Sequence, residues 1–436
     1  MNIQLILVIA IVLAIVLGFI TRVNTGLYAL VFAYFIGSFI MIKSPSSIVK
    51  MMPIRICFIL FAVTFFYNFA INNGTLEKLA LNIVYKFRKY PYLFPFAIYL
   101  TGILISAMGA GFYAVVALLC PLVFTICEKT GMNRLLGAMA VIYGAVAGGN
   151  LITTATGSVI VEVIASAIEG TYVTESASSL GMNVFFSTVV VTAISLTLFY
   201  FVFKGHKLTA NSFTIEKPEP YTAKQKTSLR LIIALMIIVL LPYIISKFFP
   251  DSQVLYLISM FMDVGFISIL LGIISILLKV GGQKEAIAKV PWSIIIMIGG
   301  IGILIALAVE AGTIDMLATW VNGIDNPLLI VLIMTTLGGV MSIFSSTVGV
   351  VLPTLYPIVP GIAAASGLSV NLLFMVIQLG SLATGISPFS SGGGLVMGSA
   401  PDEDTRQYLY PRLLIMIPVS LVILLVIVTV MYYMIG

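Results

Sequence analysis

The chain has 436 residues, of which 61% are hydrophobic and only 9% are charged, with a net charge of +6. Soluble domains carry about 25% charged residues, so this composition excludes an ordinary soluble protein and predicts an integral membrane protein. The basic residues lie in short loops between apolar runs, a distribution that is typical of membrane proteins and gives no indication of a nucleic-acid partner.

A spanning helix needs about 20 mainly apolar residues, and runs of this length recur along the whole chain. We predict an all-α fold with ten spanning helices, two of them broken, and two re-entrant hairpins. In the first half the helices cover residues 3–21, 27–42, 54–71, 135–168 (broken) and 184–203, and the hairpin covers residues 91–126. In the second half the helices cover residues 231–245, 264–278, 293–309, 371–397 (broken) and 413–433, and the hairpin covers residues 327–362.

The two halves share an internal repeat. Adding 236 to the residue numbers pairs Ser106 with Ser342, Pro121 with Pro357, Gly144 with Gly380 and Gly157 with Gly393. Gly and Pro determine the backbone path, so both halves are expected to follow the same path. Because each half has five spans, the second half must enter the membrane in the opposite direction. We therefore predict an inverted repeat of residues 1–203 and 231–436, joined by a cytoplasmic linker at residues 204–230.

The basic residues also predict an orientation, because they favour the cytoplasmic side. With the linker inside, 18 of the 22 Lys and Arg residues lie inside, and those outside are Lys43, Lys50, Arg55 and Lys247. This predicts a multi-pass protein of the cytoplasmic (inner) membrane with both termini outside. Residues 76–90 are expected to form an interfacial helix on the inside, because they end in three basic residues, whereas the partner segment 314–326 has none.

Four segments interrupt the helices at membrane depth. Residues 106–111 and 342–347 lie at the hairpin tips, and residues 148–158 and 384–394 lie within the broken helices. Non-helical backbone inside a membrane is tolerated only when it is buried in protein or lines a cavity. Interrupted helices at corresponding positions of two halves indicate a transporter site. The alternative interpretation is that the small residues only allow close helix packing.

We predict that the four segments meet near the middle of the membrane and offer hydroxyls, an amide and backbone dipoles to a small ligand. The predicted substrate-binding residues are Asn150, Thr153, Thr154, Thr156, Ser158, Ser345, Ser346, Thr347, Ser387, Pro388, Ser390 and Ser391. The residues predicted to bind a cation or to line the site with backbone are Ser106, Gly109, Gly111, Gly149, Thr384 and Gly392. No catalytic residue, metal site or cofactor is expected, because Cys57, Cys120 and Cys127 lie in apolar runs without metal-ligand spacing.

Residues 387–394, with the sequence Ser-Pro-Phe-Ser-Ser-Gly-Gly-Gly, are the most distinctive of these segments. Together with the two hairpins and the Gly-Gly break, they resemble the ion transporter superfamily and are most similar to the divalent anion:sodium symporters and the malonate/dicarboxylate carriers. The resemblance implies an elevator-type carrier, usually a homodimer, whose hairpins and broken helices form the moving domain. Sodium-coupled members carry Ser-Asn-Thr at each hairpin tip. Here residues 111–113 are Gly-Phe-Tyr and residues 347–349 are Thr-Val-Gly, so coupling to Na⁺, to H⁺ or to exchange stays open.

The leading hypothesis is a secondary transporter, a symporter or exchanger, of a small organic anion and in particular of a di- or tricarboxylate. The alternative is a cation/proton antiporter or a metalloid efflux permease of the same superfamily. An antiporter needs a carboxylate at membrane depth, for which Glu162 is the main candidate and Asp263 and Glu310 lie at helix ends. An enzyme is disfavoured, because the chain has no His-Glu-x-x-His motif, no phosphate-binding loop and a single histidine, His206.

Overall fold

The computed structural model describes residues 3–208, 217–248, 262–313 and 326–435, together with residues 316, 319, 323 and 324. These residues form helices and connecting turns, without a strand among them. Within this part of the chain, ten helices are long and apolar enough to cross a membrane. The chain is therefore a multi-pass, all-α membrane protein, as the composition predicts.

The first half begins with three helices that the sequence predicts and continues into a hairpin and a broken helix. Its elements are α1 (Ile3–Thr21), α2 (Thr25–Phe35) with the π-helical turn η1 (Ile36–Ile40), α3 (Pro45–Lys50), α4 (Ile54–Asn72), α5 (Thr75–Lys86), η2 (Pro91–Leu93), α6 (Phe94–Ile105), η3 (Ser106–Ala110), α7 (Gly111–Thr130), α8 (Arg134–Gly149), α9 (Ala155–Ile168), α10 (Ala177–Val202) and η4 (Gly205–Lys207).

The second half has the same order of long helices. Its elements are α11 (Ala223–Phe248), α13 (Val264–Leu277), α14 (Gln283–Ala288), α15 (Trp292–Glu310), α17 (Pro327–Phe344), η5 (Thr347–Val351), α18 (Leu352–Leu355), η6 (Tyr356–Ile358), α19 (Val359–Ser366), α20 (Val370–Thr384), α21 (Ser391–Gly398) and α22 (Glu403–Ile435). The predicted interfacial helix corresponds to α5, whereas most of its expected partner at residues 314–326 lies outside the described residues.

Three helices begin earlier than the hydrophobic pattern predicts, because polar capping residues extend them beyond the apolar run. Ser176 accepts a hydrogen bond from the Ser179 N–H at 3.2 Å and starts α10 seven residues before residue 184. Asp402 accepts one from the Thr405 N–H at 2.7 Å, next to the start of α22 ten residues before residue 413. The helix α11 begins at Ala223, so the predicted linker contributes its last eight residues to a helix.

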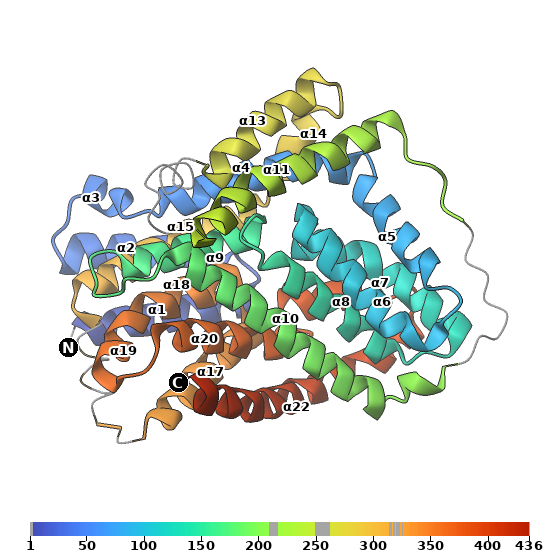
Figure 1. Ribbon diagram of the computed structural model, residues 1–436. Coiled ribbons are helices and arrows are strands. Elements are labelled where there is room, and N and C mark those ends of the chain that lie inside the picture. The colour runs from blue at the N-terminus through green and yellow to red at the C-terminus, as the bar shows by residue number, and fades with distance from the viewer. Residues whose placement is uncertain are drawn as a thin grey trace.

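The helices form two groups that each combine both halves. In the first group α2 packs against α15 and α4 packs against α13, with α1 beside α2 and α11 beside α13. The pairs α2–α15 and α13–α4 each join the second long helix of one half to the third long helix of the other half. The two pairs therefore correspond to each other in the repeat. In Figure 1, α11, α13 and α14 lie along one edge of the molecule and α22 lies along the opposite edge.

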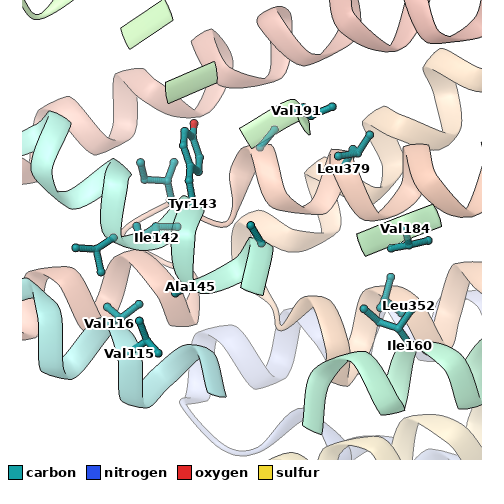
Figure 2. Close-up of a cluster of buried hydrophobic side chains, with 14 of the residues drawn as sticks. Val115, Val116, Ile142, Tyr143, Ala145, Ile160, Val184, Val191, Leu352 and Leu379 are labelled. Carbon is teal, nitrogen blue, oxygen red and sulfur yellow. The ribbon is translucent and has the colours of Figure 1, made fainter. Parts of the chain in front are cut away.

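The second group contains the hairpins, the broken helices and the last helix of each half. Here α6 packs against α8 as α17 packs against α20, and α10 contacts α8 as α22 contacts α20. A large buried core holds them together, and it includes Ile160 of α9, Leu352 of α18, Val191 of α10 and Leu379 of α20. Figure 2 shows Ile160 close to Leu352 and Val191 close to Leu379, so the core joins the two halves.

Candidate functional site

Each broken helix contains one short break with a defined beginning and end. The first lies between Gly149 and Ala155 and connects α8 to α9. The second lies between Thr384 and Ser391 and connects α20 to α21. Both fall inside the segments predicted from the sequence. The predicted breaks were longer, because the residues after each one return to helix within a turn.

The two breaks are closed by the same hydrogen bonds at positions 236 residues apart. The Thr154 hydroxyl donates to the carbonyls of Gly149 and Leu151 and accepts a bond from the Gly157 N–H at 3.0 Å. The Ser390 hydroxyl donates to the carbonyls of Gly385 and Ser387 at 2.6 and 2.8 Å and accepts a bond from the Gly393 N–H at 3.3 Å. Thr154 and Ser390 therefore act as the N-caps of α9 and α21.

The third residue of each half-helix must be glycine for the break to close. A Cβ atom on Gly157 would lie 1.9 Å from the Leu151 carbonyl oxygen, and one on Gly393 would lie 2.2 Å from the Ser387 carbonyl oxygen. Both distances are far below any contact that a methyl group can make. The pairing of Gly157 with Gly393 in the sequence thus reflects a shared close approach of backbone to backbone.

The two hairpin tips differ from each other. In the first, the chain turns through the π-helical segment η3, with positive φ at Gly109 (90°) and Gly111 (72°). In the second, α17 ends at Phe344, and two residues in extended conformation, Ser345 and Ser346, lead into η5. The Ser346 hydroxyl accepts a bond from the Gly349 N–H at 3.2 Å and caps this turn.

A cavity of about 100 Å³ lies where both breaks and both tips come together. It is large enough for several water molecules or one small organic solute. Its lining residues are Leu60, Phe112, Tyr113, Ile142, Ala145, Val146, Gly149, Asn150, Thr156, Ile294, Ser342, Ser345, Ser346, Thr347, Val348, Gln378, Ser381, Leu382, Gly385, Ser390 and Gly392. None of these lining residues is charged.

Eight of the predicted residues line this cavity, and they come from three of the four predicted segments. They are Gly149, Asn150, Thr156, Ser345, Ser346, Thr347, Ser390 and Gly392. Asn150 is also held in place, because its side-chain amide donates to the Thr188 hydroxyl of α10 at 3.0 Å. The fourth segment, the first hairpin tip, meets the cavity through the neighbouring Phe112 and Tyr113 at the start of α7.

Other predicted residues are not among the lining residues, because their polar groups serve the backbone around it. Ser158 donates to the Ile152 and Thr154 carbonyls, and Thr154 caps α9. Ser106 donates to the Ala145 carbonyl at 2.6 Å, and Thr384 donates to the Gly339 carbonyl at 2.6 Å. These hydroxyls fasten each hairpin to its broken helix.

The remaining predicted residues lie within the breaks and tips but away from the cavity. The Ser387 hydroxyl accepts a bond from the Phe389 N–H at 3.2 Å, and Pro388 follows it in the same turn. Thr153 is fully buried, and its carbonyl accepts a bond from the Tyr67 hydroxyl at 3.4 Å. Gly109 makes room for the Tyr67 ring, and Gly111 begins α7. The side chain of Ser391 lies outside the described residues.

Four lining residues with polar side-chain groups lie outside the predicted set, namely Tyr113, Ser342, Gln378 and Ser381. Gln378 and Ser381 lie one turn apart on α20, within a helix that is otherwise almost entirely apolar. A polar amide in an apolar spanning segment is itself an indication of a functional position. Gln378 and Ser381 show this pattern in the sequence, but they lie outside the four interrupted segments from which the site residues are predicted.

Glu162, the predicted candidate for a proton or cation site, does not line the cavity. Its carboxylate pairs with the Arg55 guanidinium, with a distance of 2.6 Å from Arg55 Nε to Glu162 Oε1. The same guanidinium lies 3.4 Å from an oxygen of Asp263, the N-cap of α13. Glu310 pairs with Lys43 at 2.5 Å. All three carboxylates therefore pair with a basic side chain outside the cavity.

Comparison with known proteins gives a family match for the first third of the chain. Residues 1–149 match the family described as dicarboxylate carrier protein MatC N-terminus. The predicted resemblance to dicarboxylate carriers is thus confirmed over a stretch that ends with α8, at the first break. None of the curated protein sequences compared with the chain matches it.

Two solved transporter structures have a similar fold. The YdaH transporter of Alcanivorax borkumensis has a TM-score of 0.58 and 16% identity, over 85% of this chain and 84% of that chain. MtrF of Neisseria gonorrhoeae, described as illuminating a class of antimetabolite efflux pumps, has a TM-score of 0.56 and 15% identity, over 87% and 81% of the two chains. At these identities the likeness concerns the fold alone. Similar over residues 1–149 to the dicarboxylate carriers, the chain is a membrane transporter and not an enzyme.

Proposed function

We propose that this protein is a secondary transporter of a small organic anion, in particular a di- or tricarboxylate, and that the anion binds in the cavity between the two breaks. One observation carries the proposal: the N-terminal ends of α7, α9, η5 and α21 all contribute lining residues. The first N–H groups of a helix have no partner within the helix and carry a partial positive charge. Four such ends around one cavity favour an anion without any Lys or Arg.

The N-caps leave the first two backbone N–H groups of these helices available to bind an anion. Thr154, Ser346 and Ser390 each accept a bond from the third N–H of the following helix. The first and second N–H groups remain for a ligand, and the lining residues Thr156, Val348 and Gly392 each stand at the second position. Carboxylate oxygens can accept several such bonds at once. The family described as dicarboxylate carriers supports the choice of a carboxylate.

The proposal includes an inverted repeat and an elevator-type cycle. The repeat is supported by matching helix pairs, such as α6–α8 with α17–α20, and by the identical hydrogen bonds at the two breaks. In the cycle, the group that holds the cavity would move against the group formed by α1, α2, α4, α11, α13 and α15. A homodimer with a moving and a fixed group in each protomer, an inner-membrane location and external termini belong to the same proposal.

An antiporter of cations and protons is less well supported. Such a carrier needs a carboxylate that exchanges a proton for a cation at the transport site. The lining residues include no carboxylate, and Glu162 is paired with Arg55. The coupling ion of the proposed carrier, Na⁺ or H⁺, is therefore bound by neutral groups or travels with the substrate.

Uptake into proteoliposomes tests the proposal directly. Labelled di- and tricarboxylates, amino acids and phosphate would be offered with an inward sodium gradient, an inward proton gradient, or internal counter-substrate alone. We expect saturable uptake of a carboxylate, and the condition that drives it identifies the coupling. Preloaded vesicles measure export, the direction described for MtrF. Absence of transport for every anion, with cation-dependent loss of a pH gradient, would contradict the proposal and favour the antiporter.

A further inference from the structure

The hydrogen-bonding side chains of the cavity come mainly from the second half of the chain. Gln378 and Ser381 on α20 line the cavity. The repeat-related residues 236 positions earlier on α8, Ile142 and Ala145, line it as well. The same backbone frame thus carries an apolar surface in the first half and a polar surface in the second. A bound anion therefore contacts an apolar surface on α8 and a polar surface on α20.

Three hydroxyl groups on the polar side already use their protons within the protein. Ser381 donates to the Gln378 carbonyl at 2.8 Å, and Ser345 donates to the Met341 carbonyl at 2.5 Å. Ser390 donates into its own break. A hydroxyl has one proton and two lone pairs. These three groups therefore offer a ligand mainly lone pairs, which accept hydrogen bonds and do not donate them.

Gln378 adds an acceptor that has no partner. The residue is 1% exposed, and its side-chain oxygen Oε1 has no hydrogen-bond donor within the part of the chain that the structure describes. Buried polar groups in native proteins are almost always paired. A ligand in the cavity can supply the donor that this buried amide oxygen lacks.

Resting on the proposed function, we propose that Gln378 determines the specificity of the carrier by accepting a hydrogen bond from an O–H group of the transported anion. The shared chemistry is an O–H group beside a carboxylate. It can be the acid proton of a singly ionised dicarboxylate or the alcohol of a hydroxycarboxylate. The carboxylate faces the helix N-termini, and the O–H group faces the amide. In the first case the substrate itself carries the proton, which fits a lining without ionisable carboxylates or histidine.

The unmodified protein in proteoliposomes tests this with two probes, succinate and malate, which differ by one hydroxyl. At pH 8 both carboxyl groups of each are ionised, so succinate has no O–H group and malate has one. We expect the KM for malate to be lower by roughly tenfold or more, as for a buried group left unpaired. Near pH 5 the partly protonated succinate should approach malate. Equal KM values at pH 8, or a preference for succinate there, would overturn the proposal while leaving the carrier function intact.

The variant Gln378→Met removes the amide and keeps the length of the side chain. We expect it to lose the preference for malate at pH 8 and the gain for succinate near pH 5. The matched control is Gln283→Met on α14, which removes an exposed amide that does not line the cavity and should keep both. A preference retained in Gln378→Met would also overturn the proposal. Failure of the unmodified protein to carry either anion would instead contradict the proposed function. Gel filtration verifies that each variant is folded, and the comparison of the two probes in the unmodified protein needs no variant.

Discussion

Thr154 and Ser390 show how one hydroxyl can end a helix and start the next. Each donates back to carbonyls that the break has freed and accepts the N–H that the new helix cannot satisfy. From the sequence, both residues are predicted to bind substrate. A hydroxyl at a helix break can, however, bind either a ligand or the backbone. Residue type predicts that choice poorly, because the direction of the side chain depends on the dihedral angles of the break.

At the same scale, glycine can be tested on one short helix. Gly393→Ala places a Cβ 2.2 Å from the Ser387 carbonyl oxygen and must open the second break. Gly398→Ala lies on the same helix with nothing within 4 Å of its Cβ, so it is the matched control. We expect Gly393→Ala to abolish uptake and to lower the unfolding temperature, and Gly398→Ala to change neither. Equal behaviour of the two variants would contradict the geometry of the break.

Asn150→Ala and Ser390→Ala test the cavity itself. The first removes a lining amide and its bond to Thr188, and the second removes the cap of α21, which stabilises by about 0.5–2 kcal/mol. Both should raise the KM for the transported anion several-fold while the protein still inserts into the membrane. Thr429→Ala, which removes only a bond to the Leu425 carbonyl within α22, is the control. Unchanged affinity in both test variants would argue against this site.

At the scale of elements, the hydrophobic pattern predicts which helices exist better than where they begin. The spans α4, α13 and α15 start and end within about two residues of their predicted bounds. The helices α10, α11 and α22 start earlier, in polar sequence that capping residues and neighbouring helices stabilise. Apolar periodicity cannot show such extensions, because the added turns do not face lipid.

Asp402 beside the start of α22 gives a prediction for acid conditions. The Thr405 N–H donates to its carboxylate at 2.7 Å and lowers the pKa of Asp402 below the ordinary value. Because the pKa of Asp402 is lower in the folded protein than in the unfolded chain, the cap contributes stability at pH values above the unfolded pKa. This contribution is lost as the pH falls through the folded pKa. We expect the protection of the Thr405 amide from hydrogen exchange, measured relative to its intrinsic rate at the same pH, to fall below about pH 4. In Asp402→Ala the exchange should be fast at neutral pH and should no longer depend on this titration.

The ion pair between α4 and α9 should slow the transport cycle. Arg55 binds Glu162 of the cavity-holding group and Asp263 of the other group, so relative movement must break it. Arg55 is 68% exposed, and solvated pairs are worth only about 0–1 kcal/mol. We therefore expect Glu162→Gln to increase the rate of counter-substrate exchange by at most about fivefold.

Glu310→Gln is the control for this change. Its pair with Lys43 lies within the group of α2 and α15, so its loss should not speed the cycle. Initial rates of exchange in proteoliposomes measure both variants. The same rate in both would contradict the assignment of α4 and α9 to groups that move against each other.

At the scale of the whole molecule, the distribution of basic residues predicts which side faces the cytoplasm. Both termini lie towards the same side of the view in Figure 1, as an orientation with two external termini requires. Single cysteines at Lys50 and Lys224, both exposed, test the direction. A membrane-impermeant maleimide should label Lys50→Cys in intact cells and Lys224→Cys only after permeabilisation. The reverse pattern would invert the proposed topology.

The sequence alone was sufficient to predict the all-α membrane fold, the two breaks and eight residues of the cavity lining. Repeat-related Gly and Pro made this possible, because they mark the backbone path in both halves. It was not sufficient to predict the lining contributed by unbroken helix, such as Gln378 and Ser381. The sequence shows these two polar side chains in an apolar span, but not that they face the cavity, because this depends on how α20 packs beside α10 and α17.

The two matching breaks also have an evolutionary consequence. The side chains that shape the breaks, at positions 154, 157, 390 and 393, are mostly different from the side chains of α8 and α20 that line the cavity, at positions 142, 145, 378 and 381. Substrate specificity can therefore change by single substitutions in the cavity lining while the two helix breaks stay the same. A homologue could therefore evolve to import or export a different compound through substitutions in only one of the two repeats.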